Sequence, residues 1–183
     1  MGALVIQDFC GRHLERVASV ILSGTNPGLE ALGDEAKRRF LQERLEPLER
    51  ELPLADFFQS LIPRLLGPSA LASLREEFLE AAKCIRKEPY MQMMQAIATT
   101  DFRKVLPKIA VPALVLVGEQ DRIAPPRVAG YVATHLPDAE KVVIAASGHV
   151  PNREQPQVFN TIVRAFLHKH ADRATNRSAS NHK

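Results

Sequence analysis

Aromatic side chains are scarce in this sequence of 183 residues: tryptophan is absent, and phenylalanine and tyrosine together make up 5%. Proteins that bind single-stranded nucleic acid stack the bases on aromatic rings, so this scarcity argues against that class. The net charge of +3 comes from the end of the chain, where four basic residues from Lys169 onward stand against Asp172 alone. We therefore predict no nucleic-acid partner and a disordered tail over residues 171–183, in preference to a basic arm that contacts phosphate.

Cysteine is rarer than the aromatic residues, and its two positions exclude a disulfide framework or a cysteine-based metal site. Cys10 and Cys84 both fall in apolar helical patterns, so we expect buried free thiols, as in a reducing compartment. No apolar run is long enough to span a bilayer, and the start of the sequence has no secretion-signal pattern. These absences predict a cytoplasmic protein with no membrane partner.

Three segments of the sequence differ in their hydrophobic pattern. Residues 1–28 combine a short helical pattern with a β-branched run at 17–23, which we expect to be a strand buried on both faces. Residues 29–106 carry amphipathic helical patterns broken by prolines, with no strand. Residues 107–170 alternate strand, helix, strand and helix, and the second of these strands, 141–146, is also expected to be buried. Strands that alternate with helices indicate an α/β fold with a parallel sheet.

The clearest helix of the middle segment is predicted over residues 68–86, where apolar residues recur at helical spacing. A second helical stripe places Tyr90, Met93, Met94 and Ile97 on one face. We favour ordinary helix packing for this stripe over a substrate-lining wall.

Two polar residues with catalytic chemistry follow two consecutive predicted strands. Asp121 ends ALVLVGEQD, and His149 follows KVVIAAS. Loops at the carboxyl ends of parallel strands lie side by side, so the carboxylate can orient the imidazole as the general-base half of a nucleophilic triad. Each residue has an ordinary alternative: Asp121 as the cap of a turn, and His149 as a surface histidine. Their joint placement at strand exits favours the catalytic interpretation.

VPALVLVGEQDRIAPP, followed by KVVIAASGHVPNREQP and a closing helix, resembles the C-terminal signature of the α/β-hydrolase family. MGALVIQDFCGRHLERVASVILSGT is similar to the helix and strand that come just after the nucleophile elbow of that family. Within the family, SGHVPNREQP looks most like the oxoadipate enol-lactonases. The resemblance implies an incomplete α/β-hydrolase fold: three parallel strands with flanking helices and a helical cap. It divides the chain into core at 1–28, cap at 29–106 and core at 107–170.

The resemblance also implies a function and a set of site residues. Asp121 and His149 would be the catalytic acid and base, and Met1 would give its backbone N–H to the oxyanion hole. The substrate would be a small carboxylic ester, thioester or lactone, with no metal or organic cofactor. The residues expected to line the substrate pocket are Phe57, Phe58, Leu61, Met93 and Met94.

One element of the family is missing from this sequence, because no G-x-S-x-G occurs in it. Ser23 and Ser147 lie near strand ends but not on a strand-to-helix elbow. We therefore expect a C-terminal fragment that lacks the nucleophile, is inactive alone and leaves strand 17–23 as an exposed edge open to self-association. A non-enzymatic binding protein and a split enzyme remain alternatives. The family also includes dehalogenases with an aspartate nucleophile and cofactor-free oxygenases.

Overall fold

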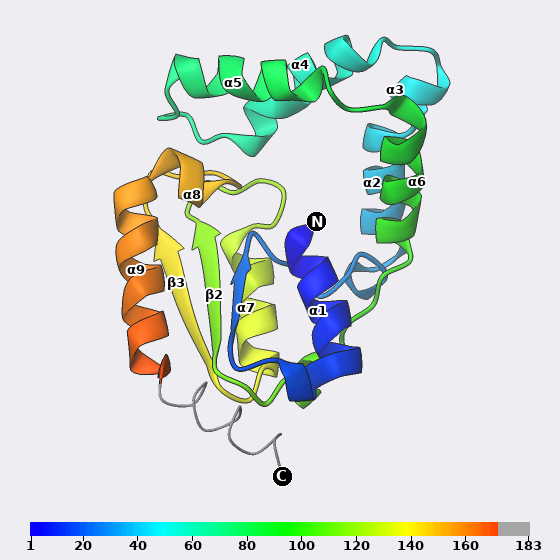
Figure 1. Ribbon diagram of the computed structural model, residues 1–183. Coiled ribbons are helices and arrows are strands. Elements are labelled where there is room, and N and C mark those ends of the chain that lie inside the picture. Colours follow the sequence, from blue (N-terminus) through cyan, green and yellow to red (C-terminus); the bar gives the residue numbers. More distant parts are fainter. Residues whose placement is uncertain (172–183) are drawn as a thin grey trace.

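The computed structural model describes residues 1–171 and contains one parallel sheet of three strands in the order β1-β2-β3 (Figure 1). The register pairs Leu22 of β1 with Val115 of β2, and Leu116 of β2 with Val142 of β3. The elements, with short 3-10 turns written η, are α1 (Gly2–His13), η1 (Leu14–Arg16), β1 (Val20–Ser23), η2 (Glu30–Leu32), α2 (Asp34–Arg44), α3 (Glu46–Glu49), α4 (Leu54–Leu65), α5 (Ala72–Ala82), α6 (Lys87–Ala98), η3 (Leu106–Lys108), β2 (Ala113–Gly118), α7 (Pro126–His135), β3 (Ala139–Ile144), α8 (Pro151–Glu154) and α9 (Pro156–Lys169).

Helices cover both faces of the sheet. On one face, Leu4 of α1 and Val132 of α7 belong to a hydrophobic cluster with Val115 of β2. On the other face, Leu114 of β2 packs in a second cluster with Phe166 of α9. The central strand β2 is buried along its whole length, which explains its continuous apolar sequence. The predicted α/β fold with three parallel strands and flanking helices is confirmed.

The two outer strands are less buried than the sequence predicts. The prediction of a strand buried on both faces at 141–146 is wrong, because Lys141 and Val143 of β3 are exposed and Val143 keeps 43% of its surface. β3 forms an edge, so α9 covers the side of Ile144 while the opposite side has less cover. β1 is shorter than the predicted 17–23 and leaves Ile21 partly exposed.

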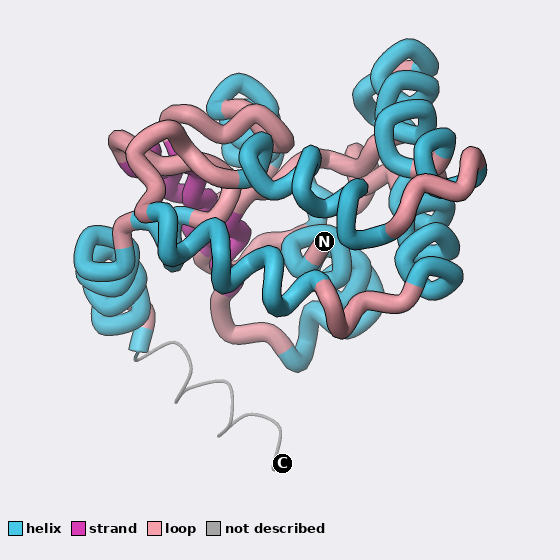
Figure 2. The backbone as a smooth tube through the Cα atoms, turned by 90° about the horizontal axis from the view of Figure 1, so that it is seen from above, coloured by secondary structure: helices cyan, strands magenta, loops and turns pink. Residues whose placement is uncertain are grey.

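Helices α2 to α6 form a separate group, which we call the cap helices. They pack around their own cluster, in which the rings of Phe57, Phe58 and Tyr90 meet edge to face with centroids 5.3 to 5.5 Å apart. In Figure 1, α4 and α5 lie beyond the carboxyl ends of the strands, and Figure 2 shows them from above with the strands behind. The domain boundaries at residues 28 and 106 stay a prediction.

The helix predicted over 68–86 is shorter in the structure, where α5 spans Ala72–Ala82. Leu71 precedes the helix and keeps 73% of its surface exposed. Cys84 lies in the turn after the helix and is exposed, so the prediction of a buried thiol there is wrong, whereas Cys10 is buried against the sheet. Apart from Ala171, the tail that is expected to be disordered lies outside the described residues.

Within residues 1–171, no helix is both long enough and apolar enough to cross a membrane.

Candidate active site

The loops that leave the three strands meet at one edge of the sheet. Gly24 follows β1, Asp121 follows β2, and His149 follows β3. His149 Nδ1 lies 2.9 Å from Asp121 Oδ2, so the imidazole donates Nδ1–H to the carboxylate. The two residues that the sequence places at consecutive strand exits are therefore in direct contact.

The Asp121 carboxylate is fixed through both of its oxygens. Oδ1 accepts hydrogen bonds from the backbone N–H groups of Ile123 and Ala124, each at 2.8 Å, while Oδ2 faces His149. The residue is buried, with 3% of its surface exposed. Asp121 thus caps the turn and holds the imidazole at once, and its role as a catalytic acid stays a prediction.

His149 is held through its backbone as well as its ring. Its N–H donates to the carbonyl of Leu65, at the end of α4, over 2.7 Å. A Cβ at Gly24, whose φ is +57°, would lie 2.8 Å from the His149 ring, so only glycine fits there. Within residues 1–171, nothing hydrogen-bonds to Nε2, and the side chain keeps 19% of its surface exposed. That free nitrogen is the atom that can accept a proton.

Glu154 is a positioning residue that the sequence does not reveal. Its Oε1 accepts from the N–H of Gly148 at 2.8 Å, and its Oε2 accepts from the N–H of Gly67 at 2.7 Å. The first contact fixes the loop that carries His149, and the second ties that loop to the segment between α4 and α5. Gly67 is 87 residues away in the sequence, so no local pattern could have indicated this contact.

Replacing Glu154 by alanine is expected to lower the free energy of unfolding by about 2 kcal/mol, because two backbone N–H groups would lose a charged acceptor. Urea unfolding followed by circular dichroism measures the change. The matched control is Glu76→Ala, an exposed position on α5, where we expect a change within about 0.5 kcal/mol. Equal effects of the two substitutions would contradict a positioning role for Glu154.

The other predicted site residues have clear positions in the structure. Met1 precedes α1, its carbonyl accepts from the N–H of Leu4 at 2.8 Å, and burial lowers the pKa of its amino group. Figure 1 places this end of α1 at the level of the strand exits. The five expected lining residues all belong to the cluster of the cap helices, and four of them are buried there. Their role as a pocket lining stays a prediction. Among the described residues, no three His, Cys, Asp or Glu side chains are grouped as metal ligands.

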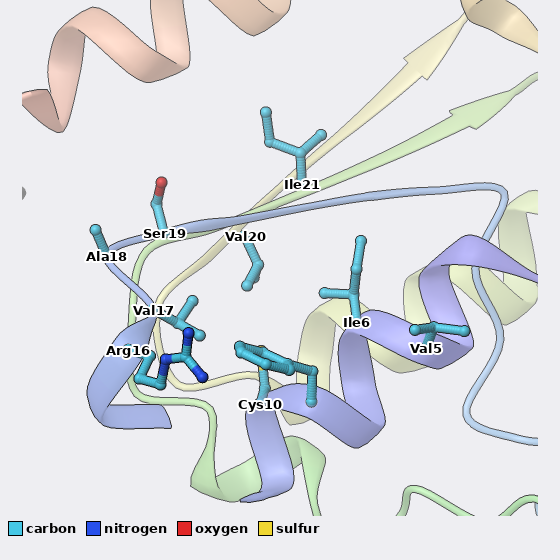
Figure 3. Close-up of a pocket in the computed structure, with 10 residues that line it drawn as sticks. Val5, Ile6, Cys10, Arg16, Val17, Ala18, Ser19, Val20 and Ile21 are labelled. Atoms are coloured by element: carbon cyan, nitrogen blue, oxygen red, sulfur yellow. The ribbon is translucent and has the colours of Figure 1, made fainter. Parts of the chain in front are cut away.

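Within residues 1–171, β1 has a hydrogen-bonded neighbour on one side only, β2, and an apolar pocket of about 460 Å³ opens where α1 and β1 meet. Figure 3 shows Val20 on the side of the strand that faces α1 and Ile21 on the opposite side, with Ile6 and Cys10 below. Val5 and Phe9 of α1 also line it and keep 60% and 38% of their surfaces exposed. The edge of β1 thus presents both an unpaired strand and uncovered apolar side chains.

The sequence and the fold are similar to those of known hydrolases. The sequence is 28% identical to that of 3-oxoadipate enol-lactonase 2 of Acinetobacter baylyi, over 91% of this chain and 61% of the lactonase. It is 30% identical to a pimeloyl-[acyl-carrier protein] methyl ester esterase of Neisseria meningitidis, over 91% of this chain and 66% of the esterase. A thermophilic esterase from Thermogutta terrifontis matches in structure with a TM-score of 0.80 and 29% identity, over 92% of this chain and 62% of that chain.

The chain therefore spans about three fifths to two thirds of the length of these relatives. The family model described as the alpha/beta hydrolase family matches residues 1–162, which is most of the sequence. The expected resemblance is confirmed, and the chain belongs to the alpha/beta hydrolase family.

Proposed function

We propose that this chain carries the acid and base of a hydrolase that acts on a carboxylic ester, thioester or lactone, and that the nucleophile lies outside these 183 residues. The hydrogen bond of 2.9 Å between His149 Nδ1 and Asp121 Oδ2 carries the proposal, because it leaves Nε2 free to act as a general base. The relatives named as esterases and an enol-lactonase support the substrate class.

The proposed mechanism uses this geometry. His149 Nε2 takes the proton of a serine hydroxyl while the serine oxygen attacks the carbonyl carbon of the substrate. The bond to the leaving group breaks, and Nε2 returns the proton to the departing alkoxide or thiolate. Water then hydrolyses the acyl-enzyme: His149 takes a proton from the water and gives it to the serine oxygen. Asp121 keeps Nδ1 protonated and stabilises the imidazolium, and Met1 N–H is one candidate donor to the oxyanion.

The proposal is tested on the native polypeptide that contains this sequence, isolated from the cells that make it. It should hydrolyse at least one of three probes: p-nitrophenyl butyrate, a short acyl thioester or γ-butyrolactone. Its intact mass should exceed that of the 183-residue chain, and a peptide with a reactive serine should be found in it. If the native polypeptide hydrolysed none of the three probes, the assignment would be overturned.

A second function has support of its own in the edge of β1. An unpaired strand beside exposed Val5 and Phe9 fits a chain that binds a strand of another polypeptide, either as an inactive binding subunit or as one half of a split enzyme. This function predicts that the native chain has the mass of the 183 residues and co-purifies with a partner. A split enzyme would gain activity when the partner is added, and an inactive subunit would not.

The placement of the protein in the cytoplasm stays a prediction.

A further inference from the structure

A pocket rich in arginine lies between the cap helices and the loop that carries Asp121. It has a volume of about 320 Å³ and is lined by Arg39 and Arg44 of α2, Arg64 of α4 and Arg122 of the loop after β2. Of the lining side chains from the described part of the chain, Glu43 alone is acidic, so the four guanidinium groups exceed the negative charge by three. Such an excess of positive charge in a concave site attracts anions.

Arg44 is the buried member of this group, with 7% of its surface exposed. The Glu43 carboxylate is already paired with Arg64, over 2.7 Å. Within residues 1–171, no carboxylate pairs with Arg44, whose guanidinium carbon lies 5.9 Å from the centre of the Phe40 ring. The pKa of the Arg44 guanidinium is lowered, mainly by burial. Tyr90 and Glu43 raise this pKa in part, and the positive charge of Arg64 lowers it further. A buried guanidinium without a counter-charge destabilises a fold, and it is expected where a ligand supplies the missing charge.

We propose that this pocket binds a carboxylate group of the substrate and that Arg44 is the residue that selects for it. The guanidinium can donate two parallel hydrogen bonds to one carboxylate, which suits a buried and otherwise unpaired arginine. Arg122 directly follows Asp121 in the sequence, and Ile123, whose N–H donates to the Asp121 carboxylate, also lines the pocket. A substrate with its carboxylate here therefore has one end anchored beside the loop of the catalytic acid.

This inference rests on the proposed function, because the bound carboxylate belongs to a substrate only if the protein is a hydrolase. The binding itself is testable without any hydrolysis. The probes are monomethyl adipate, which has one carboxylate and one ester, and dimethyl adipate, which is its neutral counterpart. Binding of each to the full 183-residue chain is measured by isothermal titration calorimetry. We expect monomethyl adipate to bind at least about 10-fold more tightly than dimethyl adipate, as the charge-assisted hydrogen bonds require.

Arg44→Met should remove this preference, because methionine fills a similar apolar volume without the charge. Arg38→Met is the matched control: Arg38 is also on α2 but is exposed and paired with Glu35, so the preference should stay. A second measurement separates a binding role from a structural one. Thermal unfolding of Arg44→Met without ligand should give a Tm equal to or higher than that of the unmodified chain, since an unpaired buried charge is removed.

Three results would overturn the carboxylate site. Equal binding of the two probes by the unmodified chain would do so without any variant. A preference retained in Arg44→Met would assign the selectivity elsewhere, and a clearly lowered Tm would make Arg44 a structural residue. Tight binding of monomethyl adipate by a native protein that hydrolyses no ester would leave the site intact and overturn the proposed function alone.

Discussion

In the native polypeptide that carries the nucleophile, His149→Ala is expected to lower kcat/KM for ester hydrolysis by about 10⁴-fold or more. The imidazole is the one group in the described site with a ring nitrogen left free to accept a proton, and Asp121 already holds its other nitrogen. Initial rates with the best of the three probes measure the loss. His149→Gln should lose as much activity, because an amide can donate to Asp121 but cannot take up a proton.

The control for this prediction is His168→Ala, which removes an exposed histidine of α9 and should leave kcat/KM unchanged. Circular dichroism verifies that each variant is folded, since alanine at 149 leaves the buried Asp121 carboxylate without its imidazole partner. A folded His149→Gln variant with full activity would show that another group is the base, and the assignment of the acid–base pair would then be wrong.

The second large effect is expected at Gly118, the last residue of β2. A Cβ there would lie 2.0 Å from the carbonyl oxygen of Gly148 and 2.4 Å from that of Ser147. Those atoms are backbone and cannot move without displacing the loop that carries His149. We expect Gly118→Ala to lower the free energy of unfolding by about 3 kcal/mol or more, as overpacking against a fixed backbone does. Urea unfolding of the chain measures it.

Gly130→Ala provides a control with the same chemical change and the opposite expected sign. Gly130 lies inside α7, and the nearest atom to its added Cβ would be Lys141 Nζ at 3.5 Å. Alanine in a helix is favoured over glycine by about 0.5–1 kcal/mol, so this variant should be more stable. If both substitutions stabilised the chain, the close packing of β2 against the loop of His149 would be contradicted.

The sequence was most informative where a local pattern and a general rule of fold geometry coincide. The apolar runs before Asp121 and His149 indicated parallel strands, and the rule that such strands end at one edge brought the two residues together before any contact was known. Within the described residues the pair is in hydrogen-bonding contact. The same runs did not indicate how far each face is covered, because cover depends on which helices pack there, as the exposed Val143 shows.

The residues that the sequence did not reveal act through distant contacts. Glu154 follows the histidine loop as one more charged residue, and its importance depends on Gly67 of a different segment. Arg44 ends a helix, DEAKRRFLQER, that is polar enough to be taken for a solvated one. Only the packing of α2 among the other cap helices buries it. In both cases the side chain type is ordinary and its surroundings are what distinguish it.

The short stretch from Leu65 to Gly67 limits how this fold can be rebuilt. Its two ends are bound to the histidine loop, one through the N–H of His149 and the other through the carboxylate of Glu154. If the helices upstream of this stretch were exchanged for those of a relative, to change which substrates enter, His149 would stay in place. A graft or an insertion that shifts residues 65–67 would move His149 together with the new helices, so the contact between His149 and Asp121 would be disturbed as well. In the design of chimeric hydrolases from this chain, that junction is the segment to keep.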